Sequence, residues 1–590
     1  MKKTAMRLVS LALALMLLCG AALAEGDVWA LEGWPDHPNV PGLEIPGWEE
    51  LPANSDEFKF RQTDPSVERE MEGNMYKQGW PLVKETEHLS ILAKQAADIV
   101  DISNGHWLIE KLQERNNVII DWQLIPSASW AEGVNLAIAS DDLTDIIIGG
   151  SFTKSQQLLY GDQQGIFVDI SQYFDDYTYY IKSFFEKRPD MLSYITTPTG
   201  NVYGLFSNAC NFHVSMGHKM WVNTAWLEAC GLEKPTTTEE FADMLRAFKT
   251  QDPNGNGEAD ELPMVGSPTG WNSRIDDFLV NAFTLHPVQA NCLVVDENGQ
   301  IGFSFMKDEY KEAMKYIHGL VEEGLIDKDS FVRDGTALSA LGLANDDYDI
   351  IGAFQGGYYG VAGYDIDHTN PRSAVWEPIS PLKGPEGVQI AYQDPFGALT
   401  EAQFVVTKAA ENPALCVRWI DYFYSPYQDI GPQGEYWDFA KEGELDLFFK
   451  DQAYWTNLST NFDGRNENVR VESTGFPYCY VSFDMRAAET AVNPNGYDSL
   501  MYNWTREYYE QYANPNYVPA DFFVPLDVVD DYNTAMTDIQ DYYKEISTKF
   551  MTGDLDIDAY WDEYIGTIES MDLDLVLEQA QAAYDQYIGK

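Results

Sequence analysis

Residues 249–264 read Lys-Thr-Gln-Asp-Pro-Asn-Gly-Asn-Gly-Glu-Ala-Asp-Glu-Leu-Pro-Met. Side chains that carry oxygen stand at every second position, at Asp252, Asn254 and Asn256. Gly257 follows where a tight loop needs a positive φ, which glycine adopts without strain. Calcium is held in proteins by about six to eight oxygen ligands, and a short loop with this alternation supplies them. Up to its ninth position the segment therefore has the spacing of an EF-hand calcium loop.

The end of the segment departs from that pattern. Its twelfth position is Pro263, where the EF-hand has a glutamate, and Glu261 at the tenth position is the carboxylate that can take this role. A polar surface turn rich in Asn and Gly, with no bound metal, is the alternative interpretation. The calcium interpretation predicts a structural metal site with six ligand residues, namely Asp252, Asn254, Asn256, Glu258, Asp260 and Glu261.

The segment before the loop predicts a short strand, a helix that ends at Gly231, and a second helix capped by Thr237 or Thr238, with Glu240 placed for a capping box. The run 220–263 resembles the extracellular solute-binding proteins of carbohydrate ABC transporters, in the oligosaccharide-binding branch that includes alginate-binding proteins. In that branch a pattern vN…WL…lGl…P.T..E leads into DPNGNG..DE.P. The resemblance implies that the loop holds a calcium ion.

Other segments fit the same family. Residues 135–147 are similar to its nlmlASGdlPDii pattern, with Asp142 and Thr144 in place of Gly and Pro, and 164–170 and 199–205 continue the resemblance. The resemblance implies an α/β, two-lobed fold of the periplasmic-binding-protein type (type II). Such a fold has mixed sheets flanked by helices, and here a helical C-terminal region.

The hydrophobic pattern from residue 86 onward supports an α/β fold. Strands are predicted at 88–93, 118–122 and 145–148, and helices at 104–115 and 130–139. Strands that alternate with helices predict a largely parallel sheet.

The chain is predicted to cross between its lobes more than once. The expected order is a signal peptide at 1–24, an extended leader at 25–85, the first part of lobe one at 86–208, lobe two at 209–395, a return to lobe one at 396–440, and a helical region at 441–590 that completes lobe two and the cleft.

The first residues predict a targeting segment. Three basic residues precede an apolar core, Leu8–Leu18, and a small-x-small cleavage site that ends at Ala24. Cys19 suggests a lipid anchor, but Leu17 and Leu18 occupy positions where a lipobox has small residues, so simple cleavage is favoured. The protein is thus expected to be secreted, on the extracellular face of the cell envelope or in the periplasm.

Composition excludes some partners. The chain has 38 basic and 94 acidic residues, a net charge of −56, which opposes nucleic acid, anionic membranes and polyanionic ligands. A neutral sugar is therefore favoured over a uronate, and the protein is expected to be a monomer. Six scattered cysteines without a C-x-x-C motif do not form a disulfide framework.

No catalytic motif is present in the sequence. Gly-x-Ser-x-Gly, His-Glu-x-x-His and a phosphate-binding glycine loop are all missing, so the chain is not expected to be an enzyme. A glycoside hydrolase stays open as an alternative, because two carboxylates suffice for that chemistry and acids are abundant. A surface glycan-binding adhesion protein is a further alternative.

Ligands of open α/β sheets sit beyond the carboxyl ends of the strands, and sugars favour flat aromatic rings beside polar side chains. Several predicted loops hold that mixture, with acids and amides but no cation, although core packing is the alternative for each single ring. The predicted ligand-binding residues are Asp101, Asn104, Trp107, Ser151, Asn208, Trp271, Phe354, Gln355, Tyr358, Trp376 and Glu377.

These features together predict a receptor of an ABC importer. It would close on an oligosaccharide by a hinge motion near 206–212 and 392–402, and deliver it to permease subunits in the membrane.

Overall fold

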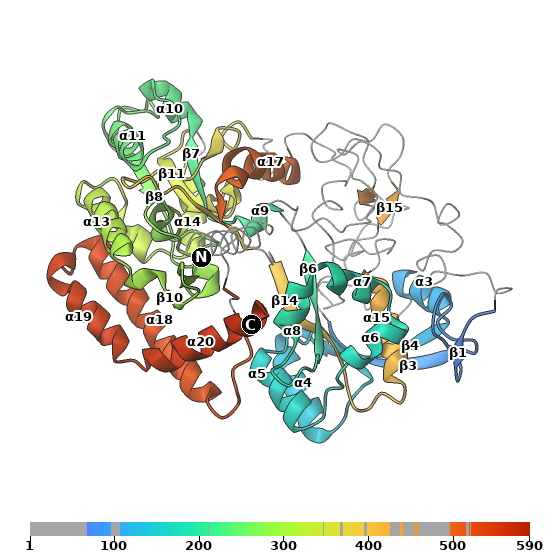
Figure 1. Ribbon diagram of the computed structural model, residues 1–590. Coiled ribbons are helices and arrows are strands. Elements are labelled where there is room, and N and C mark those ends of the chain that lie inside the picture. The colour runs from blue at the N-terminus through green and yellow to red at the C-terminus, as the bar shows by residue number, and fades with distance from the viewer. Residues whose placement is uncertain are drawn as a thin grey trace, which may run out of the picture.

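The computed structural model describes residues 68–95, 107–209, 212–345, 347–365, 370–394, 398–424, 437–439, 455–457, 496–514, 518–519 and 521–589. Two lobes lie side by side, each around its own β-sheet (Figure 1). The signal peptide and most of the leader predicted from the sequence lie outside the described residues.

The sheet of the first lobe has five strands in the order β4-β3-β5-β14-β6. Strands β3, β4 and β5 are parallel, whereas β14 runs antiparallel to both β5 and β6. The sheet is therefore mixed but largely parallel, as expected: β4, β3, β5 and β6 run in one direction, and β14, which returns from the other lobe, is the reversed strand. Its strands are β3 (Glu87–Gln95), β4 (Val118–Pro126), β5 (Ile146–Ile148), β6 (Gly204–Ala209) and β14 (Ala398–Val406).

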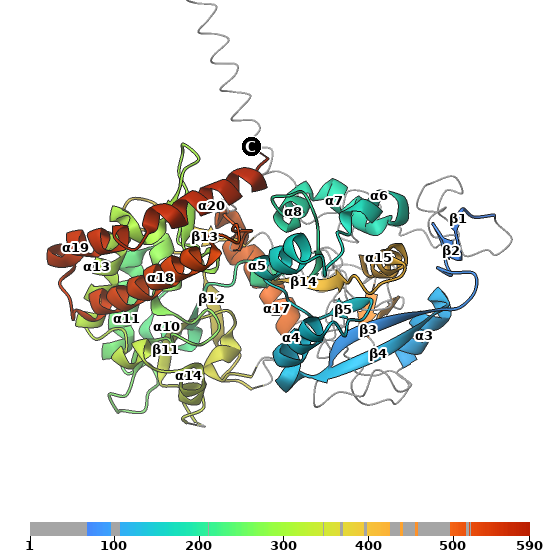
Figure 2. The ribbon, with the colours of Figure 1, turned by 90° about the horizontal axis from the view of Figure 1, so that it is seen from below.

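Short helices cover both faces of this sheet (Figure 2). The pair α3 and α4 lies close to its predicted bounds. The helices of the lobe are α3 (Trp107–Asn116), α4 (Trp130–Ser140), α5 (Lys154–Gln157), α6 (Phe174–Tyr177), α7 (Tyr180–Lys187), α8 (Pro189–Ile195) and α15 (Pro413–Asp421).

The end of the leader is part of the first lobe. Strands β1 (Met71–Glu72) and β2 (Met75–Tyr76) form an antiparallel pair, and Leu82 and Val83 are buried in the core of this lobe. Apolar side chains before residue 85, where the leader was predicted to end, thus already belong to the core of this lobe.

The sheet of the second lobe has four strands in the order β12-β7-β11-β8, with only β11 and β8 parallel. Because β7 and β11 are central and helices cover the sheet, every residue of both strands is buried. The strands are β7 (Lys219–Asn223), β8 (Leu262–Val265), β11 (Ile351–Gly356) and β12 (Trp376–Ile379), and a hairpin is formed by β9 (Leu293–Val295) and β10 (Ile301–Phe303).

The predicted caps of the second lobe are confirmed. The Asn223 side chain caps the first helix, which ends at Gly231 in the left-handed conformation, and Thr237 and Glu240 form a capping box. The helices are α10 (Thr224–Cys230), α11 (Thr238–Thr250), α12 (Ile275–Leu279), α13 (Asp308–Glu322) and α14 (Gly335–Gly342).

The C-terminal region is helical and packs mainly on the second lobe (Figure 2). Helix α18 lies along α13, where the Tyr310 hydroxyl donates to Ser547 Oγ at 2.9 Å. The elements are α17 (Tyr497–Trp504), β17 (Ala513–Asn514), α18 (Val529–Thr552), α19 (Ile557–Glu569) and α20 (Leu573–Tyr587), preceded by a pair of short strands, β15 (Trp437–Phe439) and β16 (Trp455–Asn457).

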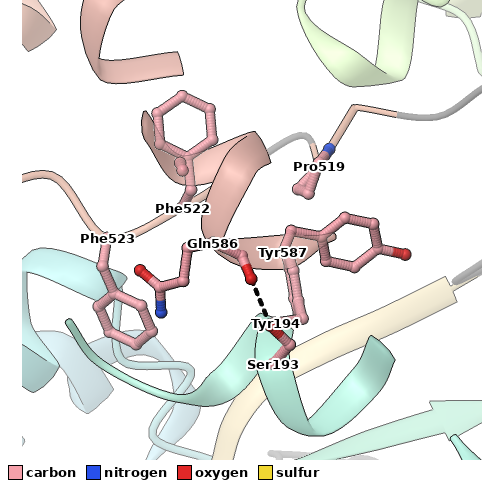
Figure 3. A pocket seen from close by; sticks show the side chains of 8 residues that line it. Ser193, Tyr194, Pro519, Phe522, Phe523, Gln586 and Tyr587 are labelled. Carbon is pink, nitrogen blue, oxygen red and sulfur yellow. Dashed lines mark hydrogen bonds between the residues drawn. The ribbon is translucent and has the colours of Figure 1, made fainter. Parts of the chain in front are cut away.

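Helix α20 also reaches the first lobe. Ser193 Oγ in α8 donates to the carbonyl of Gln586 at 3.1 Å (Figure 3), and the Gln586 amide donates to the carbonyl of Thr196 at 3.0 Å. A cavity of about 20 Å³ lies at this contact. Ligand pockets have volumes of roughly 300–1,000 Å³, so this cavity is too small to bind an oligosaccharide.

Two further segments connect the lobes. The first contains α9 (Phe212–Ser215) between β6 and β7, and the second runs from β13 (Ala391–Tyr392) to β14. In the part of the chain that the structure describes, no helix is long and apolar enough to cross a membrane. Cys230, Cys292 and Cys416 are free.

Candidate ligand and calcium sites

The loop between α11 and β8 is tightly curved. Asp252, Gly255 and Gly257 have φ values of 48°, 69° and 77°, so the backbone enters the left-handed region three times within six residues. Gly257 has the positive φ that the sequence predicted for this position. Because several residues have the left-handed conformation, the loop folds back on itself within a few residues.

Side-chain oxygens of the loop accept hydrogen bonds from the loop's own amides. Gly257 N–H donates to Asp252 Oδ2 at 3.1 Å, and Asn256 N–H donates to Asn254 Oδ1 at 3.0 Å. Glu258 N–H donates to Asn256 Oδ1 at 2.7 Å. These bonds hold the three alternating side chains against the backbone of the loop, and the Asn254 and Asn256 amide nitrogens both donate to the Asp260 carboxylate.

Glu261 is the residue least satisfied by the protein alone. Its Oε1 is buried, with no hydrogen-bond partner among the described residues. Burial raises the pKa of Glu261, and the negative charges of Asp260 and Asp252 add to this shift. A carboxylate oxygen that lacks a partner and faces like charges suits a cation, so the residues present fit a calcium ion.

Carboxylates alone do not complete such a site. The described residues contain no group of three or more His, Cys, Asp or Glu side chains that could hold a metal. Amide and backbone oxygens would have to supply the remaining ligands, as calcium accepts. The Glu258 side chain is exposed, and the seventh position of such a loop contributes its backbone carbonyl.

The loop is attached to the second sheet. The Asn254 amide donates to the carbonyl of Asp349 at 3.4 Å, and Leu262 N–H donates to the carbonyl of Ile350 at 2.7 Å. Arg372 in turn binds the Asp349 carboxylate at 2.6 Å. An ordered loop therefore supports the pairing of β8 with β11.

Two of the predicted aromatic residues lie together on the second lobe. Trp271 is 41% exposed and Tyr358 is half-buried, and their ring centroids are 5.6 Å apart at 53°. Gly357 N–H donates to the carbonyl of Trp271 at 3.0 Å. A Cβ on Gly357 would lie 2.4 Å from an atom of the indole, so only glycine lets the ring rest there. We call Trp271 and Tyr358 the aromatic platform.

Gln355 is buried directly behind the platform. Its amide donates to the carbonyl of Asn272 at 3.3 Å, and its Oε1 accepts from Phe278 N–H at 2.9 Å. Asn272 has a φ of 52°, and the Gln289 amide donates to its Oδ1 at 3.2 Å. Gln355 thus holds the Trp271 loop and does not itself reach the surface.

Three other predicted residues do not join the platform. Phe354 and Trp376 are fully buried with ring centroids 4.8 Å apart, because both strands that carry them are covered on each face. Glu377 forms an ion pair with Lys234 at 2.6 Å, and the same ammonium donates to the Tyr508 hydroxyl at 2.9 Å. The structure thus corrects the expectation that Phe354 and Trp376 are open to a ligand, whereas the Glu377 side chain stays 38% exposed beside Lys234.

The remaining predicted residues belong to the first lobe. Ser151 is exposed with a φ of 47°, and its Oγ accepts from the Gln403 amide at 2.8 Å. Asp101 and Asn104 lie outside the described residues. Trp107 begins α3, and Asn208 lies in β6 opposite Leu399. The structure describes the backbone of these two residues but not their side chains.

Two residues near the platform were not predicted. Tyr497 at the start of α17 meets Tyr358 edge-on, with centroids 5.6 Å apart at 86°. Arg274 follows Trp271 in the same loop and is bound by the Asp276 carboxylate at 2.6 Å. The chosen loops themselves contain no cation, and the charge of Arg274, three residues after Trp271 in the chain, is offset by its own carboxylate partner.

Two lobes on separate mixed sheets, joined by short crossing segments, define a solute-binding protein fold of type II. A family model for bacterial extracellular solute-binding proteins matches residues 106–429. The match spans more than half of the chain, and the chain belongs to this family. The family consists of binding proteins and not of enzymes.

Similar proteins agree with this assignment. The fructooligosaccharide ABC transporter substrate-binding protein FusA of Streptococcus pneumoniae is 28% identical over 494 residues, covering 82% of this chain and 87% of FusA. The structure of a FusA EF-hand mutant in complex with fructo-nystose has a TM-score of 0.63 and 25% identity, covering 85% of this chain and 99% of FusA. An extracellular solute-binding protein of Bifidobacterium longum subsp. infantis has a TM-score of 0.65 and 23% identity, with 85% and 98% coverage.

Proposed function

We propose that the protein is the substrate-binding receptor of an ABC importer for oligosaccharides. The observation that carries the proposal is the exposed aromatic platform on a chain of the solute-binding family. FusA, which shares most of its length with this chain, is a fructooligosaccharide receptor of such a transporter. The permease subunits of the transporter are the expected partners, and the receptor acts as a monomer.

The ligand is proposed to be a neutral oligosaccharide that contacts both lobes. Trp271 and Tyr358 would stack against sugar faces, and Ser151 would contribute from the first lobe. Asp101, Asn104, Trp107 and Asn208 stay predictions for the same side of the first lobe. The division into lobes at 208/209 and 395/396 also stays a proposal, which the membership of the two sheets supports.

The loop 252–261 is proposed to hold a structural calcium ion through Asp252, Asn254, Asn256, Glu258, Asp260 and Glu261. The unpartnered Glu261 oxygen and the side-chain oxygens of Asn254 and Asn256, held in place by loop amides, support this assignment. When bound, the ion would neutralise the clustered carboxylates. The protein's own residues would then hold the β8–β11 edge through Asn254 and Leu262.

The protein is proposed to be exported by its N-terminal segment 1–24 and released by simple cleavage, with anchoring through Cys19 as the alternative. Mass spectrometry of the protein from its native host distinguishes these outcomes by the mass of the mature N-terminus.

A screen of the purified protein against neutral and acidic glycans, with kestose included, tests the receptor function. Tight binding of a neutral glycan, with no new reducing ends after prolonged incubation, is the expected result. Accumulation of shorter sugars would overturn it in favour of a glycoside hydrolase. Binding of no soluble oligosaccharide, together with adhesion to glycan-coated surfaces, would favour an adhesion protein.

A further inference from the structure

The side chain of Tyr497 lies between the aromatic platform and a segment that connects the lobes. Its ring meets Tyr358 edge-on on one side, with centroids 5.6 Å apart. On the other side it meets His213 edge-on at 5.5 Å and 86°, and its hydroxyl lies 3.3 Å from His213 Nε2. A continuous row of four rings, Trp271, Tyr358, Tyr497 and His213, therefore leads from the platform to α9.

Helix α9 belongs to the first connection between the lobes and also touches the second. The carbonyl of Ser215 accepts from Asp394 N–H at 2.7 Å, and Asp394 lies just after β13 on the second connection. In the same place β13 pairs with β17, which follows α17 in the chain. Both connections and the C-terminal region thus meet at α9.

The end of α9 is held from the second lobe. Lys219 Nζ is fully buried and donates to the carbonyl of His213 at 2.8 Å and also to that of Met216. The ring of Phe212 packs near Tyr502 of α17, with centroids 5.8 Å apart. Because the helix is fixed on several sides, a displacement of His213 cannot be absorbed by a loose neighbour.

We propose that Tyr497 is a positioning residue that couples the aromatic platform to α9, so that a ligand on Trp271 and Tyr358 biases the movement of the lobes. This inference rests on the proposed function, and it describes how a ligand at the same site would drive closure of the two lobes. Tyr497 needs no ligand contact for this role. Tyr497 acts through its ring contact with Tyr358 and through its ring contact with His213.

The geometry favours coupling over simple space-filling. A phenol ring has few torsional degrees of freedom, and here it is in near-perpendicular contact with two other rings. A shift of Tyr358 toward a bound sugar must therefore move Tyr497 or open a gap in a packed interior. The contact with His213 Nε2 gives the row a polar link at its far end, where α9 begins to cross.

Amide hydrogen exchange of the full-length protein tests the coupling without any ligand. Trp271→Ala releases the platform end of the row, and exchange of the amides of residues 213–216 is followed. In the wild-type background we expect Trp271→Ala to raise this exchange by about threefold, the scale of coupling between contacting residues. In a Tyr497→Phe background the same substitution should raise it by less than about half as much.

Two further variants keep the test decisive. Tyr508→Phe is the matched control, since it removes a tyrosine hydroxyl from the same C-terminal region that faces Lys234 instead. His213→Gln breaks the row at its other end and should reproduce the loss of coupling if Tyr497→Phe folds poorly. If Tyr497 had only a structural role, Tyr497→Phe would raise amide exchange throughout the lobe. The effects of Tyr497→Phe and Trp271→Ala on exchange would then simply add.

Equal increases in both backgrounds, or no change at 213–216 with Trp271→Ala, would overturn the coupling. Kestose provides a second measurement by interlobe distance in spin-labelled protein. If kestose binds, Tyr497→Phe should reduce the closed population while Tyr508→Phe does not. Failure of every glycan to bind would overturn the proposed function, whereas the exchange result would still decide the coupling.

Discussion

Single atoms decide whether the aromatic platform can form. The indole of Trp271 rests against Gly357, where a Cβ would approach it to 2.4 Å. Gly357→Ala should therefore push the ring outward. Because Trp271 is 41% exposed, its displacement uncovers little buried surface, and stability should change little. The loss of stacking predicts weaker binding of the cognate glycan by about 1 kcal/mol, or roughly fivefold in Kd.

Isothermal titration calorimetry and thermal unfolding check this prediction together. Gly302→Ala is the control, since a Cβ there meets nothing within 4 Å. Trp271→Ala and Tyr358→Ala should weaken binding further without a large drop in Tm. Wild-type affinity in all three platform variants would show that the ligand uses other rings.

The carboxylate of Glu261 should determine the response to calcium. Calcium at about 100-fold above its Kd stabilises a protein by about 2.7 kcal/mol. Glu261→Gln should lose most of this gain, because the closing carboxylate is missing. Without calcium the variant should be at least as stable as the wild type, since the substitution removes a buried charge beside Asp260.

Thermal unfolding with calcium and with EDTA measures both effects. Glu297→Gln is the matched control, because Glu297 is an exposed acid in another Asn-Gly turn. An unchanged Tm of the wild type in EDTA, with no calcium in the purified protein, would contradict the site.

At the scale of the element, helix α12 directly follows the loop that carries Trp271, and it contains a cluster of buried charged side chains. Asp276 accepts two hydrogen bonds from Arg274, whereas Asp277 Oδ1 accepts none among the described residues and lies 3.4 Å from Arg274 Nε. Asp277 Oδ2 lies 3.6 Å from His218 Nδ1. Burial raises the pKa of Asp277 to about 8, with Arg274 opposing the shift and Asp276 adding to it.

Stability should therefore depend on pH through Asp277. Its pKa is raised on folding from 3.8 to about 8, so its contribution is complete below pH 4 and is lost as the pH rises toward 8. In Asp277→Asn the side chain does not titrate, so the variant does not lose this stability as the pH rises. The free energy of unfolding of the variant relative to wild type should increase between pH 5 and pH 8.5 by about 2 kcal/mol or more.

Urea unfolding at several pH values checks the sign. Asp276→Asn is the contrast, since its carboxylate is paired with Arg274 and its removal should destabilise the protein at neutral pH. Parallel stability curves for wild type and Asp277→Asn would contradict the prediction.

Elements with local signals were predictable from the sequence, and contacts between distant elements were not. Gly231 and the Thr237 capping box mark their helices because a cap depends only on neighbouring residues. Phe354 was predicted as a ligand-binding residue because its burial could not be read from the sequence; burial depends on the strands and helices that cover the sheet. Tyr497 gave no signal, since its only distinction is a position in space beside Tyr358.

For the whole molecule, the net charge of −56 has less influence on ligand choice than its size suggests. The Debye length at physiological salt is about 8 Å, so remote charges are screened and nearby groups decide. Arg274, which follows Trp271 by three residues in the chain, is bound to Asp276. A buried uronate would lose hydration without a free cationic partner, which costs several kcal/mol.

Neutral oligosaccharides should therefore bind more tightly than polyuronates of equal length. Their affinity should change little between about 50 mM and 500 mM salt, because a neutral ligand has no net Coulomb attraction to screen. Titration of both ligand classes across this range measures the difference. Selective, salt-sensitive binding of a polyuronate would contradict the charge argument.

The exposure of Trp271 gives the protein an optical readout of its own. Among the tryptophans whose side chains the structure describes, Trp271 is the exposed one, whereas Trp221, Trp376 and Trp419 are buried. Water-exposed indoles emit at longer wavelength and are reached by acrylamide, so the difference between wild type and Trp271→Phe isolates the emission of this ring. A sugar that covers it would shift that difference spectrum to the blue and shield it from quenching, which makes ligand screening possible without any attached dye.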